Sequence, residues 1–191
     1  LSNLDAKLRV ETRLELRRLE RSLGVTAVYV THDQEEAMTI ADRVAVFMEG
    51  RLMQTGTPKE IFMRPATAAV AAFIGTPPMN LLDARLSGTQ VVVGDATLPV
   101  AAGTTQGTGE RDITLGVRPG DLRLAEHGIA AQVEYVEDLG DSLVANLRVG
   151  TQRVKLKKDP NGAALAEGQP VHLAFAPEAA HLFDRASGDR L

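Results

Sequence analysis

The sequence contains no cysteine and no tryptophan, and aromatic residues make up only 4% of its 191 residues. Without cysteine, the chain can build neither a disulfide scaffold nor a thiol nucleophile or thiolate metal site. It also lacks an apolar run approaching the ~20 residues that span a bilayer, and no basic segment followed by an apolar one opens it. The net charge of −4 argues against a protein that acts mainly on nucleic acid. We therefore expect a globular chain without an export signal.

Glycine is unevenly distributed along the chain. Four of the 17 glycines lie in residues 1–80 and thirteen lie after them, which favours a helical or mixed first part and a turn-rich β second part. The prolines of Gly75-Thr76-Pro77-Pro78 stop any helix that reaches them. We predict a first domain over 1–75, a linker over 76–82 and a second domain over 83–191.

The first part has the pattern of an α/β domain. Ser2 and Asp5 have the spacing of a capping box, and leucines at helical spacing follow them up to a C-terminal Gly24. Residues 25–31 (VTAVYVT) are β-branched and almost continuously apolar, which predicts a strand buried on both faces. Helices are also predicted from Asp33 to about Ala41, from Thr57 with its Pro58 and Glu60, and over 66–74, with strands at 43–48 and 51–54. Alternating strands and helices predict a parallel sheet with covered faces.

His32 is the first candidate site residue, because it directly follows the predicted buried strand. Ligands of such sheets bind beyond the carboxyl ends of the strands. The alternative is that His32 is only a polar residue at a strand end. Asp33 and Glu36 are interpreted as helix-capping groups. The four arginines of the first helix are predicted to form a solvated face paired with glutamates of the same helix; these arginines are Arg13, Arg17, Arg18 and Arg21.

Several motifs follow one another in the order of a known family. Leu1-Ser2-Asn3-Leu4-Asp5 resembles the D-loop of ATP-binding cassette (ABC) ATPases, and residues 29–38 (YVTHDQEEAM) resemble their switch-histidine segment. In the second part, residues 115–119 (LGVRP) resemble the start of the G-x-R-P-E motif of a C-terminal regulatory domain. Gly120 stands where that motif has glutamate, and Asp121 follows it. Further matching segments lie at 42–46, 50–58, 72–75, 137–140 and 181–183. The resemblance covers nearly the whole chain and is specific to importers of sugars, polyols and related solutes.

The resemblance implies roles for the first part. His32 would contact the γ-phosphate of ATP and the attacking water in a full-length chain, while Ser2, Asn3 and Asp5 would lie at the interface between two ATPase subunits. The phosphate loop, the L-S-G-G-Q signature and the catalytic glutamate of the family are not in this sequence. We therefore expect a C-terminal fragment that needs the rest of its parent to use ATP and Mg²⁺, and that has no cofactor and no ATPase activity alone.

The second part is predicted to be all-β. Short strand candidates are separated by turn residues at fairly regular spacing, which is typical of a small barrel; they lie at 91–93, 97–100, 113–117, 129–136, 142–149, 152–156 and 170–175. The resemblance implies an OB-like regulatory domain. Few aromatic residues and an acidic balance disfavour nucleic-acid binding. We interpret Lys155, Lys157 and Lys158 as a solvated strand end, and His127, His172 and His181 as structural rather than metal ligands.

Two hypotheses remain open at this point. The first is an ATPase subunit of an importer, a homodimer that works with transmembrane permease subunits and indirectly with a solute-binding protein at the inner face of the cell membrane. The second is a stand-alone regulatory or small-ligand-binding module that kept an ATPase remnant. The fold class expected under the first is an α/β remnant of a P-loop ATPase domain followed by an all-β OB-like barrel domain.

Overall fold

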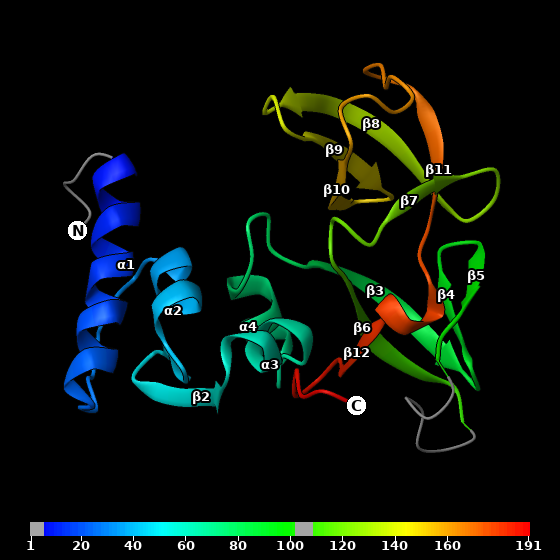
Figure 1. Ribbon diagram of the computed structural model, residues 1–191. Helices are drawn as coiled ribbons and strands as arrows, with labels where there is room; N and C mark the ends of the chain where they lie inside the picture. The colour runs from blue at the N-terminus through cyan, green and yellow to red at the C-terminus, as the bar shows by residue number, and fades with distance from the viewer. Residues whose placement is uncertain (1–5, 102–108) are drawn as a thin grey trace. The chain divides into compact units, whose positions relative to one another are not determined.

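The computed structural model describes residues 6–101 and 109–191. The chain forms two compact units, one up to Pro65 and one over Ala66–Leu191 (Figure 1). The sequence prediction places this boundary later, after residue 75, because the pair Pro77-Pro78 follows there, whereas the structure places it at Pro65. Ser2, Asn3 and Asp5 lie outside the described residues.

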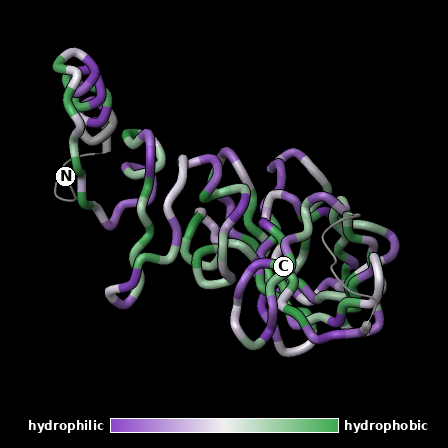
Figure 2. The backbone as a smooth tube through the Cα atoms, turned by 90° about the horizontal axis from the view of Figure 1, so that it is seen from below, coloured by the Kyte–Doolittle hydropathy of each residue, from purple (hydrophilic) through white to green (hydrophobic). Residues whose placement is uncertain are grey.

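The first unit is mostly helical. Its long helix ends as predicted, because Gly24 has a φ of 62° and its N–H bonds to the carbonyl of Glu20. Figure 2 shows both hydrophobic and hydrophilic residues along this helix. The elements of the unit are α1 (Ala6–Leu23), α2 (Gln34–Ile40), β1 (Val44–Met48), β2 (Arg51–Gly56) and α3 (Pro58–Met63).

The sheet of the first unit differs from the predicted parallel one. Strands β1 and β2 pair antiparallel across a two-residue turn. Both turn residues have positive φ, 49° at Glu49 and 74° at Gly50. This conformation matches the twist of a hairpin, which explains why the chain turns back at once instead of crossing over to a parallel neighbour. The prediction of a parallel sheet is wrong for the described residues.

Residues 25–31 form no strand, contrary to the prediction. The side chains of Val28 and Val30 are 90% and 91% exposed instead of buried. A strand needs a neighbour for its backbone hydrogen bonds and a layer for each apolar face. Within residues 6–101 and 109–191, no strand pairs with this segment, so its β-branched composition alone does not produce a strand.

The second unit consists of a short helix and two five-stranded antiparallel sheets. One sheet has the order β12-β6-β3-β4-β5 and the other β10-β9-β8-β11-β7. The seven strand candidates are all present, whereas β3, β7 and β12 were not among them. The elements are α4 (Ala68–Phe73), β3 (Asn80–Ser87), β4 (Gln90–Val93), β5 (Ala96–Pro99), β6 (Arg111–Val117), β7 (Arg123–Ala125), β8 (Ile129–Asp138), β9 (Leu143–Val149), β10 (Gln152–Lys158), β11 (Pro170–Ala174), the 3-10 turn Pro177–Ala179 and β12 (His181–Asp184).

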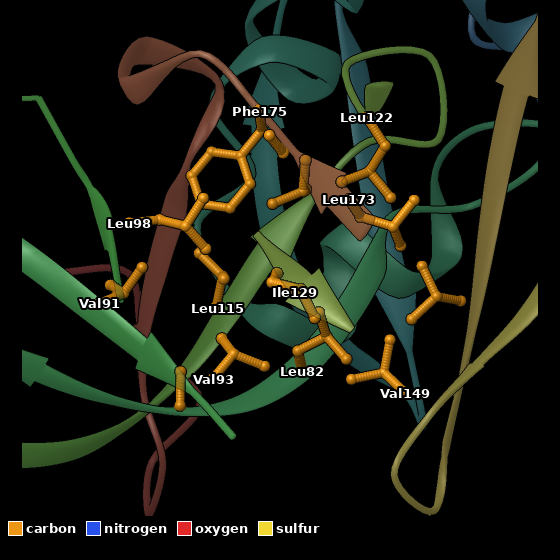
Figure 3. Packing of buried hydrophobic residues seen from close by; sticks show 14 of the residues in the cluster. Leu82, Val91, Val93, Leu98, Leu115, Leu122, Ile129, Val149, Leu173 and Phe175 are labelled. Carbon is orange, nitrogen blue, oxygen red and sulfur yellow. The ribbon is translucent and has the colours of Figure 1, made fainter. Parts of the chain in front are cut away.

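One hydrophobic core holds the two sheets together. Along β3, buried and more exposed residues alternate, as the pleat of a strand with one buried face requires. Leu115 of β6 and Leu173 of β11 are fully buried, and Ile129 of β8 is 1% exposed. Figure 3 shows these side chains gathered with those of both sheets into a single cluster. Burial of each such side chain stabilises the fold by about 1.5–3 kcal/mol. The second unit, called the all-β unit below after its two sheets, therefore has a hydrophobic core of its own.

Candidate functional site

His32 lies between the exposed segment 25–31 and the start of α2, and its side chain is exposed. The structure therefore places it at the beginning of a helix, as predicted, although the preceding strand is absent. An exposed imidazole can donate a hydrogen bond from one ring nitrogen and accept at the other. The residues on both sides of His32 are held by hydrogen bonds.

Asp33, the residue directly after His32, caps the start of α2. Its backbone is extended, and its Oδ1 accepts from the N–H groups of Glu35, at 2.8 Å, and Glu36, at 3.2 Å. These are two of the N–H groups that a helix start leaves without a partner in the helix. The predicted capping role of Asp33 is confirmed.

Glu36 has a different role from the predicted one. Its side chain is buried, with the residue only 3% exposed. One carboxylate oxygen accepts from the hydroxyl of Thr31 at 2.6 Å and from that of Tyr29 at 3.2 Å. Desolvation, and then the Glu36 carboxylate, raise the pKa of the Tyr29 phenol above its ordinary value. Glu36 thus holds the residues before His32. The alternation of Tyr29 and Thr31, which places both hydroxyls on one side of an extended segment, was the available signal.

Arg13 corrects the prediction of a solvated arginine face on α1. It is 7% exposed, and its guanidinium donates to the carboxylates of Asp33 and Glu35 at the start of α2. Arg17 likewise contacts the carbonyl of Thr39 near the other end of α2. Arg18 does pair with a glutamate of its own helix, Glu15, at 2.8 Å. Sequence spacing within α1 could not reveal contacts that span about twenty residues.

The acidic groups around His32 do not fit a Mg²⁺ site. Asp33 is occupied by the helix start and by Arg13, Glu35 also contacts Arg13, and Glu36 accepts from two hydroxyls. A Mg²⁺ ion needs oxygen ligands in near-octahedral geometry. The carboxylates next to His32 are therefore assigned no metal-binding role. No arrangement of Ser2, Asn3 or Asp5 around His32 is described, because these three residues lie outside the described ranges.

A second group of charged residues lies in the all-β unit. Arg118 is 6% exposed and donates to the carbonyl of Ile74 at 2.9 Å. His181 is 8% exposed, with its Nδ1 2.9 Å from a guanidinium nitrogen of Arg190. Burial lowers the pKa of Arg118 to about 10, and burial followed by the charges of Arg190 and Arg118 lowers the pKa of His181 to about 4. These groups join α4 and the C-terminal residues to the sheet.

The other sequence-predicted residues of this unit lie at its surface. His127 and His172 are exposed, and Gly120 and Asp121 lie in an exposed turn. The three lysines lie on β10, which is an edge strand of its sheet. The Nζ of Lys155 lies 4.0 Å from Oε1 of Glu137. The structure does not bring His127, His172 and His181 together in a group that could hold a metal ion. In the described ranges, moreover, no helix has the length and apolar character that crossing a membrane requires.

Comparison with known proteins gives a consistent family. Residues 75–122 match the MalK OB fold domain, and residues 115–183 match the TOBE domain. The chain is 42% identical to the trehalose/maltose import ATP-binding protein MalK of Thermococcus litoralis, over 98% of this chain and 54% of that protein. It is 43% identical to the sn-glycerol-3-phosphate import ATP-binding protein UgpC of Ruegeria pomeroyi, over 100% and 54%. It is 44% identical to the xylose/arabinose import ATP-binding protein XacK of Haloferax volcanii, over 100% and 52%. The chain thus spans about half the length of the curated relatives it matches.

Proposed function

Because the chain belongs to the family of ATP-binding proteins of sugar and glycerol-phosphate importers, we propose that it is the C-terminal segment of such an ABC subunit. In this proposal the complete subunit hydrolyses ATP to drive import of a sugar, a polyol or a related solute. His32 is the residue that this chain contributes to ATP hydrolysis in the complete subunit. The observation that carries the proposal is an exposed imidazole whose two neighbouring residues are both held by hydrogen bonds.

His32 suits contact with a phosphoryl group. A neutral imidazole donates from one nitrogen to a phosphoryl oxygen while the other nitrogen stays available to orient it. Phosphoryl transfer depends mostly on positioning and on charge stabilisation, so a donor whose two neighbouring residues are held by hydrogen bonds is useful. The remaining groups that hold ATP and Mg²⁺ come from the rest of the subunit in this proposal, and Ser2, Asn3 and Asp5 contribute to the interface with the second ATPase subunit. The 191-residue chain alone is expected to be inactive.

The all-β unit serves regulation and dimerisation in this proposal. It has its own hydrophobic core, and it carries both the OB and the TOBE matches. The subunit would act with transmembrane permease subunits at the inner face of the membrane. Homodimers usually close around a two-fold axis.

The first unit gives a separate reason to expect self-association of the chain. Apolar side chains lie exposed along α1 and the segment after it, including Leu19 and Leu23 at 55% and 61% and Val28 and Val30 at about 90%. Exposed apolar side chains mark interfaces where they gather into a patch, and we propose that these residues do so. We expect the 191-residue chain to be a dimer in light scattering at micromolar concentration. A stable monomer would contradict this part of the proposal.

The role of His32 is tested in the complete subunit assembled with its permease subunits. His32→Ala should lower ATP turnover at least 100-fold, which is the scale of a positioned acid–base group, while nucleotide binding changes little. His172→Ala, which removes an exposed histidine of β11, is the matched control and should turn over ATP normally. Near-normal turnover of His32→Ala would remove His32 from the reaction.

A further inference from the structure

We propose that Arg13 is a positioning residue for His32, and that it acts by tying the start of α2 to α1. The inference rests on the proposed function of His32. Arg13 does not need to touch ATP in this role. Its effect is to hold the backbone from which the imidazole projects.

Arg13 joins α1 to the start of α2, which is the end of α2 next to His32. The Arg13 Nη2 lies 3.2 Å from Asp33 Oδ2, and its Nη1 lies 3.4 Å from Glu35 Oε2. The Arg13 side chain is only 9% exposed, so water screens the pair with Asp33 less than it would at the surface. A planar guanidinium can reach two carboxylates at once, which the single ammonium of lysine does less well.

Asp33 transmits the position of Arg13 to His32. Its two carboxylate oxygens have separate tasks, since Oδ1 caps α2 and Oδ2 binds Arg13. Arg13 therefore sets the orientation of the capping carboxylate as well as the distance between the helices. His32 is the residue directly before Asp33, so a shift of this cap moves the backbone of His32.

The other side of His32 is held from within α2. Thr31 donates to Glu36 at 2.6 Å, and the Thr31 hydroxyl also accepts from the N–H of Asp33 at 2.9 Å. These bonds close a small frame around His32, but they link it only to its own helix. From α1, Arg13 reaches this frame, whereas Arg17 reaches Thr39 near the far end of α2. Small displacements of a reacting group cost up to about 100-fold in rate, so this tie affects turnover if His32 is used.

The kinetic test uses the complete subunit assembled with its permease subunits. Arg13→Gln should lower kcat about 10- to 100-fold with little change in KM for ATP. Asp33→Asn keeps a good helix cap but weakens the pair with Arg13, so it should lower kcat similarly. Because both changes break the same pair, the double variant should be no slower than Arg13→Gln. Arg17→Gln is the matched control, since it loosens the same two helices at the end away from His32, and its kcat should stay near normal.

The outcomes separate this inference from the proposed function. If His32→Ala is inactive but Arg13→Gln or Asp33→Asn keeps a normal kcat, the positioning role of Arg13 is overturned while the role of His32 stands. If Arg17→Gln loses as much activity as Arg13→Gln, helix packing in general explains the effect and the specific role of Arg13 is overturned. If His32→Ala remains active, the proposed function itself is wrong.

A spectroscopic measurement covers the case in which Arg13→Gln does not fold. In the 191-residue chain, the carbon-bound ring protons of the four histidines can be resolved by NMR and the His32 signal assigned with His32→Ala. Asp33→Asn should shift or broaden the His32 signal and leave that of His172 unchanged, and Arg17→Gln should change neither. A His32 signal that Asp33→Asn does not move would overturn the inference.

Discussion

Asn80 makes both of its side-chain hydrogen bonds to the backbone of Lys155. Its Oδ1 accepts from the Lys155 N–H at 2.7 Å, and its Nδ2 donates to the Lys155 carbonyl at 2.8 Å. The two residues lie 75 positions apart, on β3 of one sheet and on β10 at the edge of the other. The amide therefore satisfies backbone groups of an edge strand and joins the two sheets, while Asn80 itself is only 7% exposed.

Replacing Asn80 should destabilise the all-β unit. Asn80→Ala removes two hydrogen bonds and leaves a partly buried N–H and carbonyl of Lys155 without this partner, which costs about 2–4 kcal/mol. Asn146→Ala is the control, because Asn146 is equally buried but donates to the side chain of Glu137. Urea denaturation measures both changes in the free energy of unfolding. A loss below about 0.5 kcal/mol for Asn80→Ala would show that the link does not hold the sheets together.

Gly128 is expected to tolerate no side chain. Its φ is 146°, and a Cβ at this position would lie 2.2 Å from the carbonyl oxygen of Leu173 in the neighbouring strand. Gly128→Ala should therefore destabilise the unit by more than the roughly 1–2 kcal/mol that an unfavourable φ costs by itself. Gly140→Ala separates the two effects, because Gly140 has a φ of 86° but, in the described part of the chain, a Cβ there would meet nothing within 4 Å beyond its own chain neighbours. Equal losses for the two variants in thermal unfolding would contradict the steric explanation.

His181 should make the stability of the second unit depend on pH. Burial and the charges of Arg190 and Arg118 lower its pKa in the folded chain to about 4, below the ordinary value of 6.5. As pH falls below 6.5, the unfolded chain binds a proton that the folded chain does not, so the free energy of unfolding decreases until about pH 4. The loss from this group amounts to at most about 3 kcal/mol.

Denaturation at pH 7.5 and 4.5 measures this effect. His181→Gln cannot take up the proton, so the difference between the two pH values should be smaller in this variant than in the original chain. His172→Gln is the control, because His172 is exposed on β11. An unchanged pH dependence in His181→Gln would contradict the assignment.

The start of α3 provides a local test. Thr57 and Glu60 bond reciprocally, with the Glu60 carboxylate accepting from the Thr57 N–H at 2.8 Å and from its hydroxyl at 3.0 Å. These bonds from Thr57 lower the pKa of Glu60 below its ordinary value. NMR titration should show this lowered pKa, and Thr57→Ala, which removes the hydroxyl, should raise it. Lys59→Ala, one position away and outside the reciprocal pair, should leave it unchanged. A Glu60 that titrates alike with and without the hydroxyl would exclude its contribution.

Features that depend on neighbouring residues were predictable from the sequence. The Thr57–Glu60 box, the Asp33 cap and the glycine end of α1 all formed as expected, because the groups involved lie within one helical turn. Seven of the ten strands of the all-β unit were also predicted, since turn residues separate them along the sequence, whereas β3, β7 and β12 were missed. The importer-type motifs likewise pointed to the family that the comparisons support.

Contacts between distant residues were decided only by the tertiary structure. Whether residues 25–31 form a strand depends on a partner strand, which composition cannot supply, and the segment is exposed in the described chain. Spacing within α1 pairs Arg13 with its own helix, but burial against α2 directs it to Asp33. The link from Asn80 to Lys155 has no sequence signal, because it requires two sheets to be packed first. Local order follows from short-range hydrogen bonds and side-chain periodicity, whereas the frame around His32 and the junction of the sheets follow from how the elements pack.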